Sequence, residues 1–279
     1  MNYKAIPEWE NPKGIILVHP EVMLLTNQNI PKNQISKLFE ELLYSLCNTN
    51  ISIIRNNKHI HIEKTPPFED INIIDMPEVN NIWIRDWAPI LARDENGITT
   101  AIKFIYSPQY QTQKESKYGK EAGKKLAEIL YIPVIEIPLI LDGGNFTHNG
   151  KGIGIVTNRI ISDNEDYSIT EIKDIFRKYL GIEKLIFIPV EPGDITGHID
   201  GSVRFVNENT LLVGVYPDEY RKDENSISFF EYEEAKMFTI RLANNLKKEL
   251  GNKFRIVKVT NAIPHYPKRK NDFSPAFGN

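Results

Sequence analysis

The sequence predicts an α/β fold made of small repeated units arranged around a central pocket. Short apolar runs, typical of buried strands, alternate with longer segments whose apolar residues recur at helical spacing. The order strand hairpin, helix, strand occurs four times along the 279 residues. Repeats of a unit that cannot bury its own apolar face favour a closed or stacked array. No glycine-rich nucleotide-binding loop follows an expected strand, so a ring of ββαβ units is favoured over a doubly wound sheet.

The expected elements follow from these patterns in chain order. Strands are expected at residues 14–20, 51–55, 71–74, 81–93, 99–106, 134–137, 185–190, 198–206, 210–215 and 254–259. Two further extended runs are expected within residues 143–161, and helices at residues 34–47, 118–131, 168–180 and 231–250. Ser168 with Glu171 three residues later is typical of a helix start, and Gly251 is typical of a helix end.

Composition is typical of a globular protein and excludes several classes. Hydrophobic residues make up 41% and charged residues 25%, and the net charge of -3 gives no electrostatic footprint for nucleic acid. The short basic run at residues 268–270 is expected in a solvated loop. No apolar segment is long enough to cross a bilayer and the N-terminus lacks a signal-peptide pattern, so we expect no membrane partner and a cytoplasmic location. The one cysteine, Cys47, excludes an intrachain disulfide framework and a Cys-based metal cluster.

The first motif is the run Trp-Ile-Arg-Asp-Trp at residues 83–87. On a strand, Trp83, Arg85 and Trp87 would share one face. Tryptophans that flank a charged pair suit the binding of a flat cation, by stacking and by hydrogen bonds to a carboxylate. A structural Arg-Asp pair at a turn, beside core tryptophans, is the alternative for this motif alone.

The second motif is Leu-Asp-Gly-Gly-Asn-Phe at residues 141–146. Its two glycines permit a backbone geometry closed to other residues and bring Asp142 close to a ligand or a neighbouring strand. A hairpin entry, in which Asp142 hydrogen-bonds its own backbone, is the alternative.

The third motif is Gly-His-Ile-Asp-Gly at residues 197–201. On a strand, His198 and Asp200 would point to the same side, and an imidazole beside an acid is suited to proton transfer. A histidine satisfied by a local hydrogen bond is one alternative. A metal site with His198, Asp200, Asp142 and His148 as ligands is a weaker one, and we expect neither metal nor cofactor.

In this order the three motifs resemble the agmatine deiminase and bacterial-type peptidylarginine deiminase family of guanidine-modifying enzymes. Trp-X-Arg-Asp matches residues 83–86, Leu-Asp/Glu-Gly-Gly matches residues 141–144, and Gly-His-X-Asp-Gly matches residues 197–201. The resemblance extends from about residue 15 to the C-terminus. It implies a five-bladed, pentein-like α/β propeller of ββαβ units around a central pocket, in agreement with the repeat order above.

The resemblance also implies a reaction, the hydrolysis of a guanidinium C–N bond to a ureido product and ammonia. A guanidinium is planar and permanently cationic, so carboxylates are its natural partners. By resemblance, Asp86 and Asp200 hold it and Asp142 orients the site. His198 protonates the departing ammonia and then activates water.

The expected ligand is a small-molecule or peptide guanidinium: agmatine, arginine or peptidylarginine. Trp83, Asp142 and Gly197 are the expected substrate-binding residues. Asn81 stands where agmatine deiminases commonly carry an acid, which favours arginine-like substrates over agmatine.

The nucleophile is where the sequence departs from the family. The family attacks with a cysteine near its C-terminus, in a glycine-rich part of the last blade. We therefore expect residues 1–279 to form a single incomplete propeller domain that lacks this blade, is inactive alone and self-associates, with a homo-oligomer as one form. Cys47 is expected to be a buried structural residue. The alternative function is a non-catalytic guanidinium-binding module derived from the enzyme.

Overall fold

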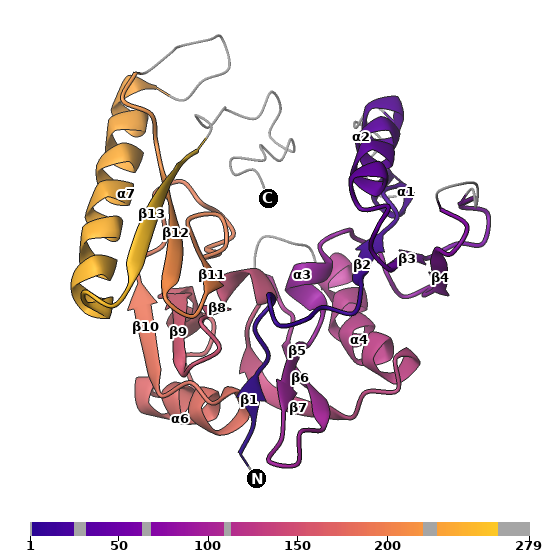
Figure 1. The fold of residues 1–279 in the computed structure, drawn as a ribbon, viewed down its shortest axis with the longest axis horizontal. Helices are drawn as coiled ribbons and strands as arrows, with labels where there is room; N and C mark the ends of the chain where they lie inside the picture. The colour runs from indigo at the N-terminus through magenta and orange to yellow at the C-terminus, as the bar shows by residue number, and fades with distance from the viewer. Residues whose placement is uncertain (1, 25–31, 63–67, 109–112, 220–227, 262–279) are drawn as a thin grey trace.

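The computed structural model describes residues 2–24, 32–62, 68–108, 113–219 and 228–261 (Figure 1). The basic run at 268–270 and the expected start of a further blade at 274–279 lie outside these residues. Among the described residues, no helix combines the length and apolar character that a bilayer span requires.

Helices and strands alternate along the chain. The helices are α1 (Glu21–Leu24), α2 (Lys32–Ser45), α3 (Ile84–Trp87), α4 (Gln113–Ile129), the short 3-10 helix η1 (Gly143–Asn145), α5 (Arg159–Ser162), α6 (Ile169–Leu180) and α7 (Phe229–Leu250). The strands are β1 (Lys4–Ala5), β2 (Ile15–Val18), β3 (Ile51–Arg55), β4 (Asn72–Asp75), β5 (Ile90–Arg93), β6 (Thr99–Ile105), β7 (Val134–Ile140), β8 (Thr147–His148), β9 (Ile153–Thr157), β10 (Lys184–Ile188), β11 (Val203–Asn207), β12 (Thr210–Val215) and β13 (Arg255–Thr260).

Three sheets repeat the predicted ββαβ unit. In the orders β5-β6-β7, β8-β9-β10 and β11-β12-β13, the first two strands are antiparallel and the third runs parallel to the second. The long helices α4, α6 and α7 make the crossovers, as a parallel connection requires. The short strand β1 extends the first of these sheets by pairing with β5.

The sheet nearest the N-terminus departs from the predicted repeat. Its strands β2, β3 and β4 are all parallel, and helix α2 connects the first two. In the described part of the chain, no antiparallel strand pairs with the outer edge of β2. The expected fourth hairpin repeat was therefore wrong, because the apolar runs in this region form a parallel β-α-β-β segment.

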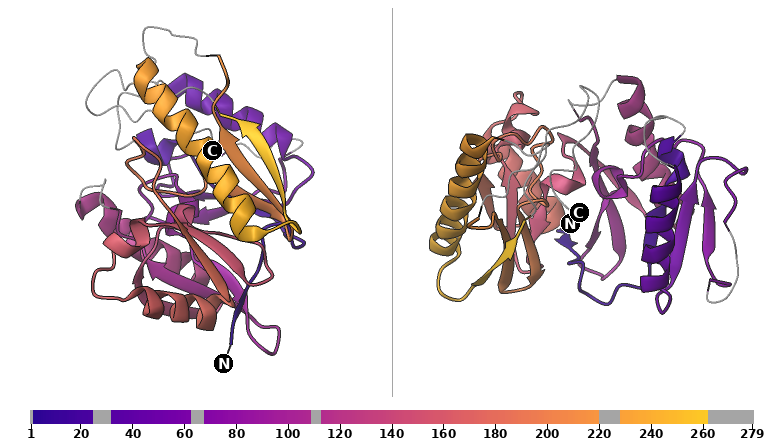
Figure 2. Two further views of the ribbon diagram at one scale, coloured as in Figure 1. Left: turned by 90° about the vertical axis from the view of Figure 1, so that its left-hand side faces the viewer. Right: turned by 90° about the horizontal axis from the view of Figure 1, so that it is seen from above.

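The sheets surround the middle of the molecule, and the long helices cover its outside (Figure 1). Figure 2 shows this for α7, which lies on the outer face of the sheet of β11, β12 and β13. Phe176 of α6 is completely buried and packs against the rings of Phe104 and Phe146, at centroid distances of 5.8 and 5.2 Å. These contacts join elements of two sheets, so the core is shared between neighbouring units.

Helix ends follow the sequence signals. Ser168 caps α6 through its contact with the Glu171 N–H, and Glu171 accepts a hydrogen bond from the Ser168 N–H, so the predicted capping box is confirmed. Gly251 follows α7 at a φ of 80°, which confirms the predicted end of that helix.

Two of the predicted strands are wrong at the motifs. The segment expected as a strand over 81–93 begins with the helical turn α3 and becomes a strand only at Ile90. Ala88 ends α3 in an extended conformation because the following Pro89 disfavours the helical one. The expected strand over 198–206 starts at Val203, so His198 and Asp200 lie in the loop before β11.

The shared core provides a test of the fold. Phe176→Ala should lower the free energy of unfolding by about 3–5 kcal/mol, because it leaves a cavity among packed rings. Phe230→Ala on α7 is the control, since Phe230 is 77% exposed and its removal should change stability by less than about 0.5 kcal/mol. Denaturant unfolding of both variants measures the difference, and equal midpoints would contradict the described packing.

Candidate active site

The three motifs meet at the backbone of Gly144. Its N–H donates a hydrogen bond to Oδ1 of Asp86 (3.0 Å), and its carbonyl accepts from the N–H groups of Ile199 and Asp200 (3.1 and 3.0 Å). Hydrogen bonds of the Gly144 main chain thus join α3, η1 and the loop before β11, the segments that carry the predicted site residues.

The glycine pair is required by close packing. A Cβ on Gly144 would lie 2.5 Å from Nδ1 of His198 and 2.6 Å from Oδ1 of Asp86. A Cβ on Gly143 would lie 1.9 Å from the carbonyl oxygen of Arg85. Any side chain at either position would push the motifs apart, so the functional interpretation of the Gly-Gly motif agrees with the geometry.

His198 lies between two carboxylates. Its Nε2 is 3.3 Å from Oδ2 of Asp142, and its Nδ1 is 3.6 Å from Oδ1 of Asp86. The side chains of Asp86, Asp142 and His198 are 9%, 10% and 11% exposed, so all three are largely withdrawn from water. We call these residues, together with Asp200, the His198 cluster.

Asp142 is only half satisfied. Its Oδ2 pairs with His198, whereas Oδ1 is buried and has no hydrogen-bond partner among the described residues. A buried carboxylate oxygen without a partner loses hydration without compensation. This oxygen is therefore available to a hydrogen-bond donor carried by a ligand.

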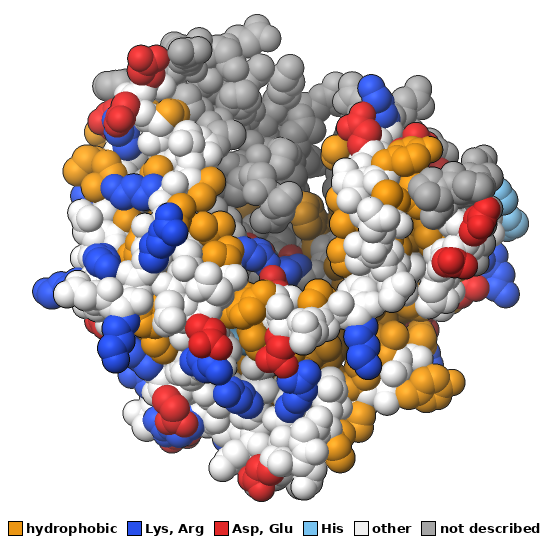
Figure 3. Space-filling model, viewed as in Figure 1, with side chains coloured by type: hydrophobic (Ala, Val, Ile, Leu, Met, Phe, Trp, Pro, Cys, Tyr) orange, Lys and Arg blue, Asp and Glu red, His pale blue; other side chains and the backbone are white. Residues whose placement is uncertain are grey.

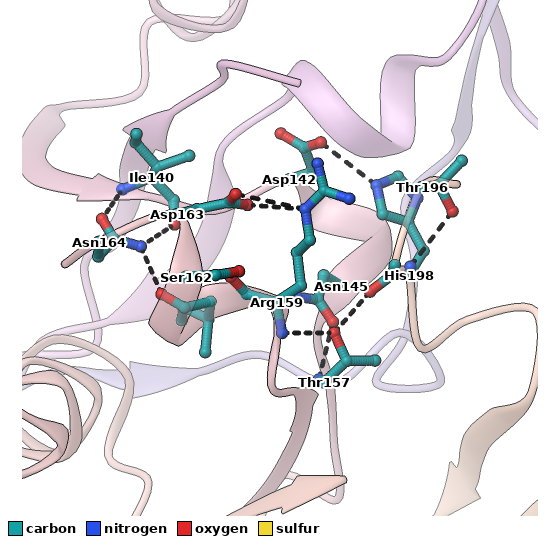
Figure 4. Close-up of polar contacts among 12 residues, drawn as sticks. Ile140, Asp142, Asn145, Thr157, Arg159, Ser162, Asp163, Asn164, Thr196 and His198 are labelled. Carbon is teal, nitrogen blue, oxygen red and sulfur yellow. Dashed lines mark hydrogen bonds and ion pairs between the residues drawn. The ribbon is translucent and has the colours of Figure 1, made fainter. Parts of the chain in front are cut away.

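The loop that carries His198 is held by α5 and the end of β9 (Figure 4). Gly197 has a φ of 68°, and a Cβ there would lie 2.9 Å from Cδ of Arg159. The hydroxyl of Thr157 donates to the Gly197 carbonyl (2.6 Å), and Nη1 of Arg159 donates to the Ile195 carbonyl (3.1 Å). Gly197, predicted as a binding residue, thus has a visible structural role in placing His198.

Asn164 connects this support to the strand that leads into Asp142. Its Oδ1 accepts from the Ile140 N–H (2.7 Å), and its Nδ2 donates to the carbonyls of Ile140 and Ile160 (2.9 and 2.8 Å) (Figure 4). The amide fixes the end of β7 against α5. The segments that carry Asp142 and Arg159 are therefore held together by Asn164.

Burial and like charge set the ionisation of Asp86. Burial raises the pKa of its carboxyl to about 7, and the negative charges of Asp200 and Asp142 add to the rise. The pKa of Asp200 is also raised by burial. The cluster therefore holds carboxylates that ionise less readily than exposed ones.

The same carboxylates keep His198 protonated. Burial alone would lower the pKa of the imidazole. The hydrogen bond with Asp142 and the negative charges of Asp86 and Asp142 outweigh burial and raise the pKa to about 9. At neutral pH His198 is an imidazolium that can donate a proton.

Two predicted participants do not fit the expected pattern. Trp83 precedes α3 and is 37% exposed, and no ring contact of Trp83 occurs within the described ranges. Its role as a substrate-binding residue stays a prediction. Trp87 is buried in the core at 1% exposure, so the two tryptophans do not flank one face as expected of a strand.

His148 and Cys47 also differ from expectation. His148 stacks on Phe146, and its Nδ1 accepts a hydrogen bond from the Gly150 N–H (3.3 Å). No group of His, Cys, Asp or Glu residues arranged to hold a metal ion is found in the described part of the chain. Cys47 is exposed just beyond α2, so its predicted burial was wrong: the stripe of apolar residues that packs on β3 ends before it.

Several charged residues near the cluster were not predicted. Arg159 pairs with Asp163 at 3.2 Å, and the charges of Asp142 and His198 act on the Asp163 carboxyl. Lys103 is buried, donates to the Phe104 carbonyl, and has its pKa lowered to about 8 by burial against the opposing charge of Asp142. Arg159 falls inside the extended runs expected within residues 143–161, whereas the structure has it in α5, two residues after β9 ends at Thr157.

The chain matches known proteins over nearly its whole length. The family model of Porphyromonas-type peptidyl-arginine deiminase matches residues 4–277. Agmatine deiminase of Medicago truncatula is 27% identical over 157 residues, which are 53% of this chain and 38% of that protein.

Solved structures agree with the fold. C. jejuni agmatine deiminase superposes with a TM-score of 0.73 at 19% identity, over 99% of this chain and 79% of the other. Agmatine deiminase of Enterococcus faecalis gives a TM-score of 0.71 at 16% identity, over 99% of this chain and 76% of the other. The predicted α/β fold and the predicted family are confirmed: the chain belongs to the family of Porphyromonas-type peptidyl-arginine deiminases, hydrolases that act on guanidino C–N bonds.

Proposed function

We propose that the His198 cluster binds the guanidinium group of a small molecule or peptide and is the site of a deiminase-type hydrolysis. The observation that carries this proposal is the buried, unpartnered Oδ1 of Asp142 beside the carboxylates of Asp86 and Asp200. Within the cluster, three acidic groups face a single imidazolium, so further positive charge from a ligand is favourable. A permanently charged guanidinium supplies both that charge and several N–H donors.

Each group of the cluster has a role in this proposal. Asp142 presents one free oxygen to the ligand and uses the other to hold His198. Oδ1 of Asp86 accepts from the Gly144 N–H, and the backbone N–H of Asp200 donates to the Gly144 carbonyl, so one residue anchors both segments. Carboxylates fixed in advance bind a planar cation at a low entropic cost.

His198 would serve the chemical step. Hydrolysis replaces one C–N bond of the guanidinium by a C–O bond, and the nitrogen leaves as ammonia only after it gains a proton. An imidazolium with a pKa of about 9 carries that proton at neutral pH. The neutral imidazole left behind could then take a proton from the attacking water.

The source of the nucleophile distinguishes two versions of the proposed function. A cysteine-to-serine variant of C. jejuni agmatine deiminase has been solved with substrate bound. In the present sequence the one cysteine is Cys47, which lies exposed beyond α2 and not in the His198 cluster. We propose that residues 1–279 alone bind the guanidinium without converting it, either as part of an enzyme whose thiolate comes from outside these residues or as a binding module.

The proposed substrate class is argued from Asn81, two residues before Trp83. The Asn81 side chain accepts a hydrogen bond from the Trp83 N–H (3.0 Å), and it brings no negative charge to the place where agmatine deiminases commonly have an acid. Agmatine carries an amine at its far end, whereas arginine carries a carboxylate beside its amine. The uncharged Asn81 supports arginine or peptidylarginine over agmatine.

Guanidinium binding is tested by calorimetry with agmatine and L-arginine. Asp86→Asn and Asp142→Asn should each weaken binding roughly 10–100-fold, because a charge-assisted hydrogen bond to a buried carboxylate is lost. Asp174→Asn is the matched control, since Asp174 is exposed and pairs with Arg177 on α6. Unchanged affinity in both cluster variants, with the fold intact, would refute the proposed site.

Binding should also depend on pH. Below about pH 7 the Asp86 carboxyl is protonated and neutral, and above it the carboxylate attracts the cation. Agmatine affinity should therefore be roughly tenfold weaker at about pH 6 than at about pH 8, and binding below pH 7 should release a proton. Titrations in buffers of different ionisation enthalpy measure that proton. A flat profile would show that Asp86 does not titrate in this range.

Turnover is a separate measurement. A colorimetric assay for ureido products should detect none from the 279-residue chain with agmatine or arginine peptides, and Cys47→Ser should leave agmatine affinity unchanged. Product formation by the purified chain would contradict the proposed inactivity. If Cys47→Ser then abolished that activity, Cys47 would be the nucleophile.

A further inference from the structure

Glu8 holds two arginines at the edge of the His198 cluster. It lies in the segment between β1 and β2, and it accepts hydrogen bonds from Arg85 and from Arg204. Nη2 of Arg204 is 3.2 and 3.1 Å from the two carboxylate oxygens of Glu8. Arg85 directly precedes Asp86 in α3, and Arg204 lies in β11, four residues after Asp200.

Both arginines act on the carboxylate of Asp200. Burial raises the pKa of Asp200, and the positive charges of Arg204 and Arg85 oppose that rise. The side chains of Arg85, Arg204 and Glu8 are 44%, 33% and 54% exposed, so they can reach solvent and rearrange. Figure 3 shows basic and acidic side chains together in the hollow at the middle of this face.

The arrangement places two guanidinium groups of the chain beside carboxylates suited to bind a guanidinium. Arginine side chains are long, and their planar fork matches a carboxylate as well as a substrate guanidinium does. Without Glu8, the nearest carboxylate in the cluster is a natural partner for Arg204 or Arg85. Their unbalanced charge would also repel a cationic ligand.

We propose that Glu8 is a positioning residue that keeps the guanidinium groups of Arg85 and Arg204 away from Asp200, so that this carboxylate stays free for the substrate. The inference rests on the proposed guanidinium binding and adds a device that prevents competition from the chain's own arginines. The competing role is a purely structural one, in which Glu8 ties the N-terminal segment to α3 and β11.

The chain offers a matched control two residues away. Glu10 lies in the same segment and pairs with Arg93 of β5, and the two side chains are 41% and 44% exposed. The charge of neither appears among those that act on Asp86, His198 or Asp200. Glu10→Gln therefore removes a comparable ion pair without releasing an arginine beside the cluster.

The test is calorimetric titration of the full chain with agmatine. Glu8→Gln should weaken binding roughly tenfold, a loss equivalent to about 1.4 kcal/mol, and Glu10→Gln should leave it unchanged. In the double variant Glu8→Gln/Arg204→Gln, affinity should recover part of this loss, because one of the two freed arginines is gone. A purely structural role predicts no recovery, so a double variant no better than Glu8→Gln overturns the inference.

A further variant and a second ligand distinguish the remaining outcomes. Arg204→Gln alone should bind agmatine at least as tightly as the unaltered chain, and a roughly tenfold loss there would also overturn the inference, even if Glu8→Gln fails to fold. Tighter binding of L-arginine by Glu8→Gln would show instead that the two arginines receive a ligand carboxylate. If the unaltered chain binds neither agmatine nor L-arginine, the proposed function fails first; if it binds agmatine and Glu8→Gln binds equally, only this inference fails.

Discussion

The contact of His198 with two buried carboxylates is the interaction on which the site depends. Three acidic groups packed this closely would repel one another and lose hydration, and both effects oppose the ionisation of their carboxyl groups. The imidazolium offsets one of these charges, and its own charge is in turn maintained by Asp86 and Asp142. In the proposed function, a cationic ligand balances the carboxylate charge that His198 leaves.

The fold makes this contact possible because it brings main-chain groups as well as side chains together at Gly144. Gly144 donates to the Asp86 carboxylate and accepts from the N–H groups of Ile199 and Asp200, next to His198, and it lies two residues after Asp142. Because Gly144 has no side chain, the imidazole and the carboxylate can approach from the space a Cβ would fill. Asn164 and Arg159 then fix the surrounding segments, so the cluster is placed by rigid elements and its loop has little freedom.

Local patterns predicted the elements that depend on local physics. The helices at 168–180 and 231–250 agree with α6 and α7 within two residues, because apolar spacing and capping are properties of neighbouring residues. The segments around Asp86 and His198 were misassigned because their alternating residues imitate a strand. The loop at His198 is instead determined by hydrogen bonds to Gly144, more than fifty positions away, and no local pattern contains that information.

Binding and bond cleavage have different requirements at such a site. The charges explain why binding can occur without cleavage. Affinity for a guanidinium comes from the carboxylates and from the absence of competing cations, all of which the described residues determine. Cleavage needs in addition an atom that attacks the guanidinium carbon, and a neutral thiol would contribute little to the charge balance. In the proposed function, the electrostatic reason to bind the ligand is therefore independent of the thiol. The arrangement of the cluster therefore serves ligand binding, and bond cleavage requires one further group, the nucleophile.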